Sequence, residues 1–417
     1  MKRSHIIVNS IMKLIHFKVF LSEIASFGGQ IKKTAGRIVC IILSLMLTFS
    51  FTGCRSRDVV EVNLEKQDHD FLLTPCKKEN GEAFTIAFMD LGPPIESSYL
   101  CLKGLAEGLQ DSGYIDADVP LSLAPQDFFE YYDVLVNSDL GGYIKFCEEP
   151  YMIDEGDNKD IAKELIEKTN NGTIDVIVAT GTDPGLFLKG LDLPVPFLVC
   201  LATDPVASGI IDSADDTGDP DIWALVEPNP YKRQFEGYYR MLEFDKILLV
   251  TVNGMDTITG NPLYREAADE LGVNILELNF EESDMHANDY EDKIANGIRD
   301  ANLTGIDAAL FAYGTMDDDN ADMLSSMLAR RGIPSLVGDG DSICENGAMM
   351  CLSCFDYEGY GNYASMVLSN IFHGRKAGEQ PCRYTSSPHV VLNMNTAEQT
   401  GFKCTFGFLQ GVDRIYR

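Results

Sequence analysis

The stretch DVIVATGTDPG, residues 175–185, decides the fold class. Its first part is a nearly continuous apolar run of strand length, and Gly, Asp and Pro then interrupt it. Strands without polar alternation are typical of parallel sheets that helices cover on both faces. The stretch therefore predicts a buried parallel strand that runs into a turn and a helix.

The same alternation of strand and helix runs along the chain twice, with about four strands each time. We predict strands at residues 84–89, 143–147, 175–179 and 195–201, and then at 246–252, 273–278, 307–312 and 333–337. The fold class is therefore α/β, with two Rossmann-like lobes that contain parallel sheets. A long helix after Tyr357 is expected to return to the first lobe. We expect lobe 1 to hold residues 82–206 and 355–376, and lobe 2 to hold 207–354 and 377–417, with three crossovers between them.

The N-terminus has the pattern of a lipoprotein signal peptide. Lys32, Lys33 and Arg37 precede an apolar run of about 14 residues, which is short for a membrane span, and Thr52-Gly53-Cys54 follows. This end resembles a bacterial lipobox, although Phe51 stands where Leu is usual. It implies a signal peptide at 1–53, a lipid on Cys54 and a flexible tether at 54–81. An uncleaved anchor helix is the alternative.

Composition excludes several classes of function. The formal net charge is −31, and the basic residues concentrated before residue 53 make the rest of the chain more acidic still, which disfavours nucleic-acid binding. Eleven cysteines show no disulfide framework, and Cys351 and Cys354 lack the further ligands of a zinc site. No nucleophile with a base is evident, so we expect no catalytic residues, metal or cofactor. Residues 115–142, with aromatic residues at 128–132, interrupt the rhythm as an insertion. We expect it to pack over the edge of a sheet, and binding of a partner is the alternative.

Candidate ligand-binding residues follow the predicted strands, because ligands bind beyond the carboxyl ends of strands in open parallel sheets. Hydroxyls and carboxylates there suit carboxylate, carbonyl and amino groups of a ligand. Turn and helix-cap chemistry is the alternative explanation for each of them. The candidates are Asp90, Ser98, Thr182, Thr203, Asp204, Thr315, Asp339 and Tyr357.

Several segments match, in order, those of a known family. They are residues 175–182, residues 195–209, Gly347-Ala348 with Phe355–Gly361, and residues 393–397. With these, the chain resembles the ABC transporter substrate-binding proteins of the tryptophan/tyrosine type, which have the type I periplasmic-binding fold. The family usually has a short turn after Gly209, whereas residues 212–222 here are acidic and different.

The resemblance implies a solute-binding lipoprotein on the extracytoplasmic face of the bacterial cell membrane. A small molecule, such as an amino acid, would bind in a cleft between the lobes, and the closed form would dock on an ABC permease with its ATPase. Tyr99, Phe187, Tyr264 and Tyr357 are candidates for stacking on an aromatic ligand. The alternatives are a ligand-binding surface sensor that signals to a membrane partner and a cleft enzyme.

Overall fold

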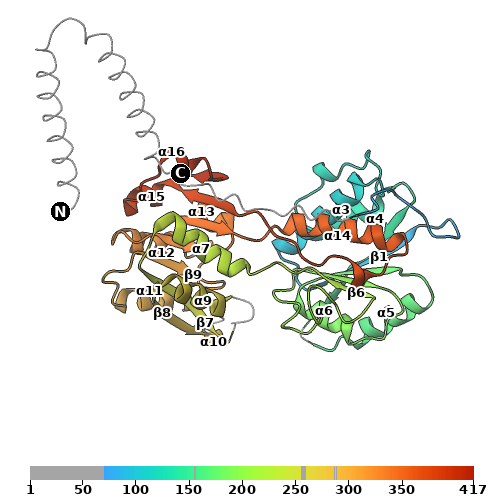
Figure 1. Cartoon of the computed structure of the whole chain (residues 1–417), viewed down its shortest axis with the longest axis horizontal. Helices are drawn as coiled ribbons and strands as arrows, with labels where there is room; N and C mark the ends of the chain where they lie inside the picture. Colours follow the sequence, from blue (N-terminus) through green and yellow to red (C-terminus); the bar gives the residue numbers. More distant parts are fainter. Residues whose placement is uncertain (1–69, 155, 255–259, 286, 288) are drawn as a thin grey trace, which may run out of the picture. The chain divides into compact units, whose positions relative to one another are not determined.

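A computed structural model describes residues 70–417, apart from residues 155, 255–259, 286 and 288. The described residues belong to one compact unit, Leu64–Arg417. Two sheets organise this unit (Figure 1). The predicted signal peptide and Cys54 lie outside the described residues. In the part of the chain that is described, no helix is long and apolar enough to cross a membrane.

The first sheet has the order β2-β1-β4-β5-β6, with β3 pairing with the far end of β1. All of its pairings are parallel, as the apolar strands predict. All five residues of β4 are buried, as the run without polar alternation at residues 176–180 predicts. Its strands are β1 (Phe84–Leu91), β2 (Ile144–Phe146), β3 (Tyr151–Ile153), β4 (Val176–Thr180), β5 (Phe197–Cys200) and β6 (Ile222–Ala224).

The second sheet has the order β13-β12-β11-β10-β9-β7-β8. Its pairings are parallel except between β11 and β12, which run antiparallel. The prediction of an entirely parallel sheet is therefore wrong at this pair. The third crossover returns the chain to the end of the sheet at which β11 finishes, so β12 runs in the opposite direction. The strands are β7 (Lys246–Asn253), β8 (Asn274–Glu281), β9 (Ala308–Phe311), β10 (Ser335–Val337), β11 (Met350–Ser353), β12 (His389–Asn393) and β13 (Arg414–Tyr416).

Helices cover both faces of each sheet. Those around the first sheet are α3 (Glu96–Asp111), α4 (Phe128–Asn137), α5 (Lys159–Asn170), α6 (Thr182–Lys189) and α14 (Tyr357–Phe372), with short turns at Leu121–Leu123 and Ala377–Glu379. Those around the second are α7 (Pro230–Leu242), α9 (Asn261–Leu271), α10 (Glu282–Met285), α11 (Tyr290–Asp300), α12 (Ala321–Ala329), α13 (Asp341–Glu345), α15 (Met394–Thr400) and α16 (Phe406–Leu409).

Each sheet carries one apolar core on each face. Along β1, Ile86 and Phe88 join the core under α3, α4 and α14, whereas Ala87 and Met89 join the core on the opposite face. The second sheet likewise has a core under α11 and α12 and another under α7 and α9. Neighbouring residues of a strand point into different cores, and this explains why neither face of the central strands is polar.

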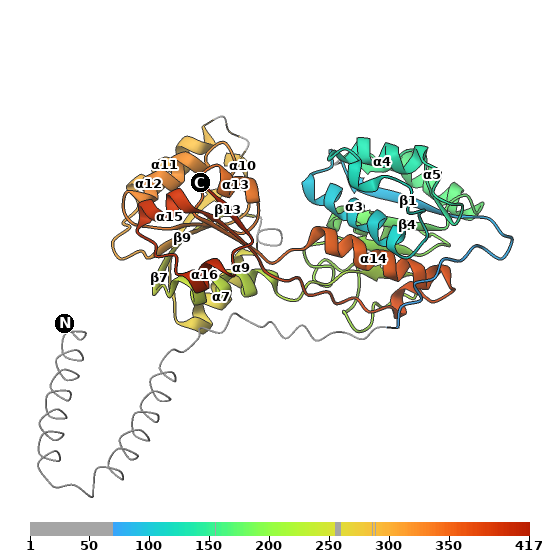
Figure 2. The same ribbon diagram turned by 90° about the horizontal axis from the view of Figure 1, so that it is seen from above.

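After β11 of the second sheet the chain forms α14, which lies along α3 of the first sheet (Figures 1 and 2). Glycines permit the close approach. A Cβ atom on Gly104 would collide with the carbonyl oxygen of Glu358, and one on Gly361 would collide with that of Cys101. The two helices therefore touch through their backbones, which fixes α14 on the first sheet although it follows the second sheet's β11 in sequence.

The limits of the lobes differ in detail from the predicted ones. β6 pairs with β5, so the first sheet extends past the predicted boundary at residue 206. Trp223 of β6 is fully buried and its Nε1 donates to the carbonyl oxygen of Pro381 at 2.9 Å, so residues 377–382 also pack on the first sheet. The complete division into two lobes stays a prediction.

Part of the predicted tether belongs to the folded unit. The ring of Phe71 contacts that of Tyr363 edge-on, with centroids 5.6 Å apart. The amide of Leu72 donates to Asn370 Oδ1 at 2.9 Å, and Lys78 pairs with Asp175 at 2.6 Å. Residues 71–78 are therefore not a free tether, because their aromatic and polar side chains and amides find partners on α14 and the first sheet.

The predicted insertion at residues 115–142 contains α4. Asp127 caps this helix, since its carboxylate accepts from the amides of Phe129 and Glu130. Phe128, Tyr131 and Tyr132 are buried in the core beneath α3 and α14, while Phe129 is exposed. The aromatic residues therefore pack over the sheet, as the sequence predicts.

Candidate functional site

The candidate residues of the first sheet gather at the carboxyl ends of its strands. Asp90 is the last residue but one of β1, and Ser98 is in the first turn of α3. Both side chains are buried, with Asp90 only 4% exposed. Burial raises the pKa of the Asp90 carboxyl, and hydrogen bonds from Ser98 and from the amide of Leu91 partly oppose this rise. Asp90 and Ser98 are therefore buried polar side chains at the carboxyl ends of the strands of the first sheet.

Thr182, Thr203 and Asp204 lie on the loops after β4 and β5. Thr182 is the first residue of α6 and follows Gly181, whose φ of 100° is typical of glycine. Thr203 and Asp204 are exposed. The Asp204 carboxylate accepts from the amides of Val206 at 3.1 Å and Ala207 at 2.8 Å, so it caps a turn. For Asp204 the structure therefore shows the capping role that we considered as the alternative.

Thr315 of the second sheet is placed differently from the expectation. Its side chain is completely buried, and its hydroxyl donates to the carbonyl oxygen of Ala312 at 2.6 Å. This bond closes the turn after β9. The hydroxyl thus faces its own backbone, because a threonine can satisfy itself within a tight turn.

Asp339 and Tyr357 are brought together. The Tyr357 hydroxyl donates to Asp339 Oδ2 at 2.5 Å, and the amide of Gly340 donates to Oδ1 at 3.0 Å. Asp339 as a whole is exposed, yet partial desolvation of its carboxylate raises its pKa. These two residues follow the neighbouring strands β10 and β11, which is why the sequence could predict both.

An aromatic group surrounds this pair. The Phe355 ring is stacked on that of Tyr357, with centroids 6.0 Å apart and planes 12° apart, and Tyr231 meets Phe355 at 5.3 Å. Tyr264, a predicted stacking residue, is instead fully buried and donates its hydroxyl to Gln234. Tyr357 and Phe355 therefore present the aromatic surface beside a carboxylate, whereas Tyr264 belongs to the core.

Asn261 is a polar residue that sequence reasoning missed. It is the first residue of α9, after β7, and it is completely buried. Neither the oxygen nor the nitrogen of its side-chain amide has a partner in the described part of the chain. A buried amide without partners is costly, so this position is unlike an ordinary core residue. Its place after a strand is the only sequence signal for it.

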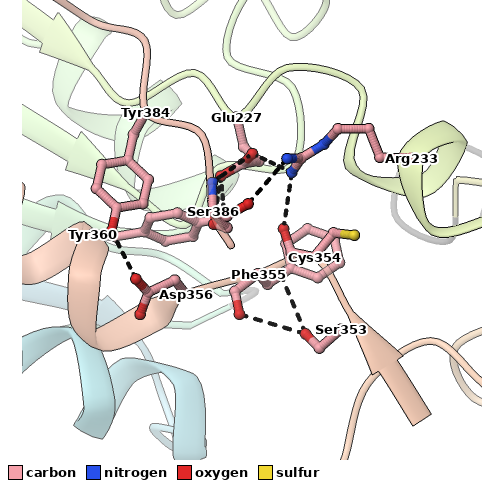
Figure 3. A network of polar contacts seen from close by, with 9 residues as sticks. All are labelled: Glu227, Arg233, Ser353, Cys354, Phe355, Asp356, Tyr360, Tyr384 and Ser386. Atoms are coloured by element: carbon pink, nitrogen blue, oxygen red, sulfur yellow. Dashed lines mark hydrogen bonds and ion pairs between the residues drawn. The ribbon is translucent and has the colours of Figure 1, made fainter. Parts of the chain in front are cut away.

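A polar network joins the three crossovers, residues 225–229, 354–356 and 380–388 (Figure 3). At its centre, Arg233 and Glu227 form an ion pair with an N–O distance of 2.5 Å. The Glu227 carboxylate also accepts from the Tyr360 hydroxyl at 3.0 Å and from the Ser386 hydroxyl at 2.6 Å. The first crossover is thereby tied to the third and to α14.

Arg233 completes the network from α7. Its guanidinium donates to the carbonyl oxygen of Ser386 at 3.0 Å and to that of Cys354 at 3.3 Å (Figure 3). Tyr384 of the third crossover donates to the Asp356 carboxylate of the second at 2.7 Å. One arginine thus contacts all three crossovers, and burial raises the pKa of its partner Glu227 despite these bonds. We name this set, Glu227, Arg233, Tyr360 and Ser386, the crossover clasp.

In the part of the chain that the structure describes, no group of His, Cys, Asp and Glu side chains could hold a metal ion. A cavity of about 690 Å³ is lined by residues of α3 and α14 and by Tyr384, with Glu107, Glu358 and Tyr363 among them. It contains none of the predicted ligand-binding residues.

The proteins to which this chain is similar are found among solved structures. No protein-family model matches the sequence, and no curated protein matches it either. A domain of an ABC protein from Streptococcus pneumonia in complex with L-Trp aligns with a TM-score of 0.55 and 16% identity, over 80% of this chain and 100% of that one. A ligand-free, open substrate-binding protein with adhesive properties from Clostridium difficile aligns with a TM-score of 0.57 and 14% identity, over 80% and 99%.

A third structure, a conserved domain protein from Vibrio cholerae, aligns with a TM-score of 0.56 and 16% identity, over 80% of this chain and 100% of that one. The chain has the type I periplasmic-binding fold. This confirms the predicted fold class and agrees with the resemblance seen in the sequence. The crossover clasp lies where the chain passes between the two sheets, and it ties these three passages together.

Proposed function

We propose that this chain is the solute-binding lipoprotein of an ABC importer. The observation that carries the proposal is the type I periplasmic-binding fold, in which the chain passes three times between two sheets. Asp90, Thr182, Asp339 and Tyr357, placed after strands of both sheets, supply polar contacts for one small molecule. A ligand that contacts both lobes favours their closed arrangement, and the closed form docks on the permease and its ATPase.

The ligand of this proposal is an amino acid or a related compound. Two features support it. Carboxylates at Asp90 and Asp339 suit an amino group, and Phe355 stacked on Tyr357 suits an aromatic side chain. One of the similar structures contains L-Trp. Thr203 and the hydroxyl of Ser98 remain proposed contacts, whereas the described geometry gives Thr315 and Asp204 turn-forming bonds.

Ligand identification tests the function directly. The soluble body would be purified and examined by native mass spectrometry, and then screened by thermal shift against amino acids, nucleosides and small peptides. A ligand at 100 times its dissociation constant stabilises the folded state by about 2.7 kcal/mol, which gives a readily measured rise in melting temperature. If no compound in these classes binds, the proposed ligand class is wrong.

Two other functions have distinguishable signatures. A surface sensor would bind its ligand in the same way, yet deletion of the chain would leave uptake of that ligand unchanged. A cleft enzyme would convert the bound compound, which mass spectrometry of the incubated mixture would reveal. An importer's binding protein returns its ligand unaltered and is required for uptake.

Lipidation of Cys54 is a separate prediction. The basic patch, the short apolar run and Gly53-Cys54 lead us to expect cleavage before Cys54 and a lipid on its sulfur. Cys54→Ser would release the protein from the membrane fraction or leave the precursor uncut, because no thiol remains to be modified. Cys76→Ser is the matched control and would leave membrane attachment unchanged. A mature protein that begins upstream of Cys54 would contradict the prediction.

A further inference from the structure

A groove follows one face of α14 beside the first sheet. Its volume is about 690 Å³, and Gly359, Asn362 and Met366 line it from successive turns of that helix. Glu107 lines it from α3, and Tyr384 lines it from the third crossover. We name this cavity the α14 groove. Small-molecule pockets have volumes on the order of 300–1,000 Å³, so the groove is large enough for a small molecule. None of the candidate ligand-binding residues that follow the strands lines it.

A glycine keeps one end of the α14 groove open. A Cβ atom on Gly359 would collide with the carboxylate of Asp356 and with the hydroxyl of Tyr384. In the space that the glycine leaves, the Tyr384 hydroxyl donates to that carboxylate at 2.7 Å (Figure 3). The end of the groove is therefore shaped by the backbone of α14 and by a fixed pair of polar side chains.

The lining of the groove carries an excess of negative charge. Asp356, Glu107 and Glu358 line it, and none of the lining residues is a lysine or an arginine. In the described part of the chain, the ion pairs of these acids all go to Lys103, whose Nζ lies 2.7 Å from Glu358 and 3.8 Å from Glu107. Three carboxylates thus share one ammonium group, and the groove attracts a further cation.

Two side chains at the groove show that the protein compensates this charge incompletely. Burial raises the pKa of Glu107, and the nearby carboxylate of Glu358 adds to this rise, although Lys103 opposes it. Tyr131 is completely buried, and its hydroxyl has no hydrogen-bond partner among the described residues. Burial raises the pKa of this hydroxyl, and both glutamates add to the rise, so it lies near them. Buried polar groups without a partner are rare in folded proteins.

An aromatic and apolar surface adjoins these carboxylates. The rings of Tyr363 and Tyr384 have centroids 5.5 Å apart, and the thioether of Met366 lines the same groove. The Tyr363 hydroxyl donates to the carbonyl oxygen of Pro381 at 3.2 Å, which holds its ring in place. Aromatic rings attract cations, and a thioether packs well against an apolar body. The groove therefore suits a cation that is attached to an apolar group.

We propose that the α14 groove is a second binding site, which takes a small organic cation with an amidinium or ammonium group on an apolar body. This site is separate from the one after the strands that we propose for the transported solute. The cationic group lies between Glu107 and Glu358, and the apolar body packs on Tyr363 and Met366. Charge-assisted hydrogen bonds to the two carboxylates supply much of the affinity.

Pairs of charged and neutral probes test the class of ligand. Calorimetry compares benzamidine with benzamide, and choline with dimethylbutanol, in which carbon replaces the charged nitrogen. We expect each cation to bind about tenfold more tightly than its neutral counterpart, and the difference to shrink as salt is added, because partly exposed charges are screened. Neutral probes that bind as tightly as the cations, or the failure of both cations to bind, would overturn the proposal.

A double variant locates the site of benzamidine binding. Glu107→Gln with Glu358→Gln removes both carboxylates and keeps the size of each side chain, so we expect an intact fold and about tenfold weaker binding. Asp111→Asn changes an exposed acid at the end of α3 and is the matched control, which should bind benzamidine as the native protein does. Native affinity in the double variant would overturn the proposal.

A cation supplied by the chain itself gives an independent test. Asn362 lies one turn after Glu358 on α14, and it lines the groove. Asn362→Arg brings a guanidinium group within reach of both glutamates, so it should exclude benzamidine, whereas Asn362→Gln should bind it with native affinity. Thermal unfolding of both variants checks that they are folded. Equal binding of benzamidine by the two variants would contradict a site in the groove.

The groove and the proposed solute site can be told apart. Asp339→Ala removes a contact of the solute site, so this variant should bind benzamidine with the affinity of the native protein. If Asp339→Ala abolishes benzamidine binding, the probe occupies the solute site. The α14 groove is then not a binding site, whereas the proposed solute-binding function stands.

Discussion

Arg233→Met is expected to lower the free energy of unfolding by about 3–5 kcal/mol, because it leaves the carboxylate of Glu227 buried without its cation. The side chain of Glu227 is only 8% exposed, and Arg233 also holds carbonyl oxygens of Cys354 and Ser386. The substitution therefore removes contacts to all three crossovers at once. Urea unfolding at pH 7.5 measures the loss.

Its neighbour provides the matched control. Lys232 pairs with Glu266 and Glu270 at the surface, and Lys232→Met should change stability little, since exposed ion pairs contribute little. The double variant Arg233→Met with Glu227→Gln should recover much of the loss, because it removes the unpaired charge and keeps an oxygen that accepts from Tyr360 and Ser386. Equal destabilisation by Arg233→Met and Lys232→Met would contradict the importance of the crossover clasp.

The loss should also depend on pH. Burial already raises the pKa of Glu227 above its ordinary value of 4.5, and the removal of Arg233 would raise it further. A protonated Glu227 needs no cation, so the variant should recover stability relative to the native protein as the pH falls from 7.5 towards 5. A loss that is constant over this range would mean that Arg233 acts through packing alone.

Asp339→Ala is expected to weaken ligand binding by one to two decades, which corresponds to the loss of a charged hydrogen bond of about 1.5–3 kcal/mol. Its carboxylate is bonded to Tyr357 and Gly340 on a loop, so the folded core loses little when it is removed. Thr182→Ala should reduce affinity less, because a neutral hydroxyl is lost. Calorimetry with the compound found by the thermal-shift screen measures both.

A surface acid after the adjacent strand serves as the control for Asp339. Asp318 is exposed in the loop between β9 and α12, and Asp318→Ala should leave affinity unchanged. Unchanged dissociation constants for both Asp339→Ala and Thr182→Ala would show that these residues are turn and cap residues and that the ligand binds elsewhere.

The strands were predictable because their signal is local. Residues 176–179 and 247–250 are continuous apolar runs, and each lies in a strand that is buried on both faces there. The orientation of a side chain that follows a strand, in contrast, cannot be predicted from the local sequence pattern. Thr315 and Asp339 both follow strands, yet the first bonds to its own turn and the second meets a tyrosine from α14. The turn geometry and a distant helix decide the difference.

The crossover clasp could not be predicted for the same reason. Glu227 and its partner Ser386 are 159 positions apart, and neither belongs to a recognisable motif. The docking of Phe71 on Tyr363 likewise joins a polar N-terminal segment to a helix far along the chain. Sequence patterns indicated the elements and their order, whereas these polar and aromatic contacts between distant segments depend on the complete fold.

The path of the chain has a consequence for its biogenesis. Lys103 of α3 meets Glu358 of α14, 255 positions later, and β12 and β13 complete the second sheet only after the chain has passed through α14. Folds dominated by such long-range contacts form slowly. Neither sheet can be completed until the residues of α14, β12 and β13 have left the ribosome. A chain that crosses a membrane before folding, as the proposed export requires, would be kept competent for translocation by this topology.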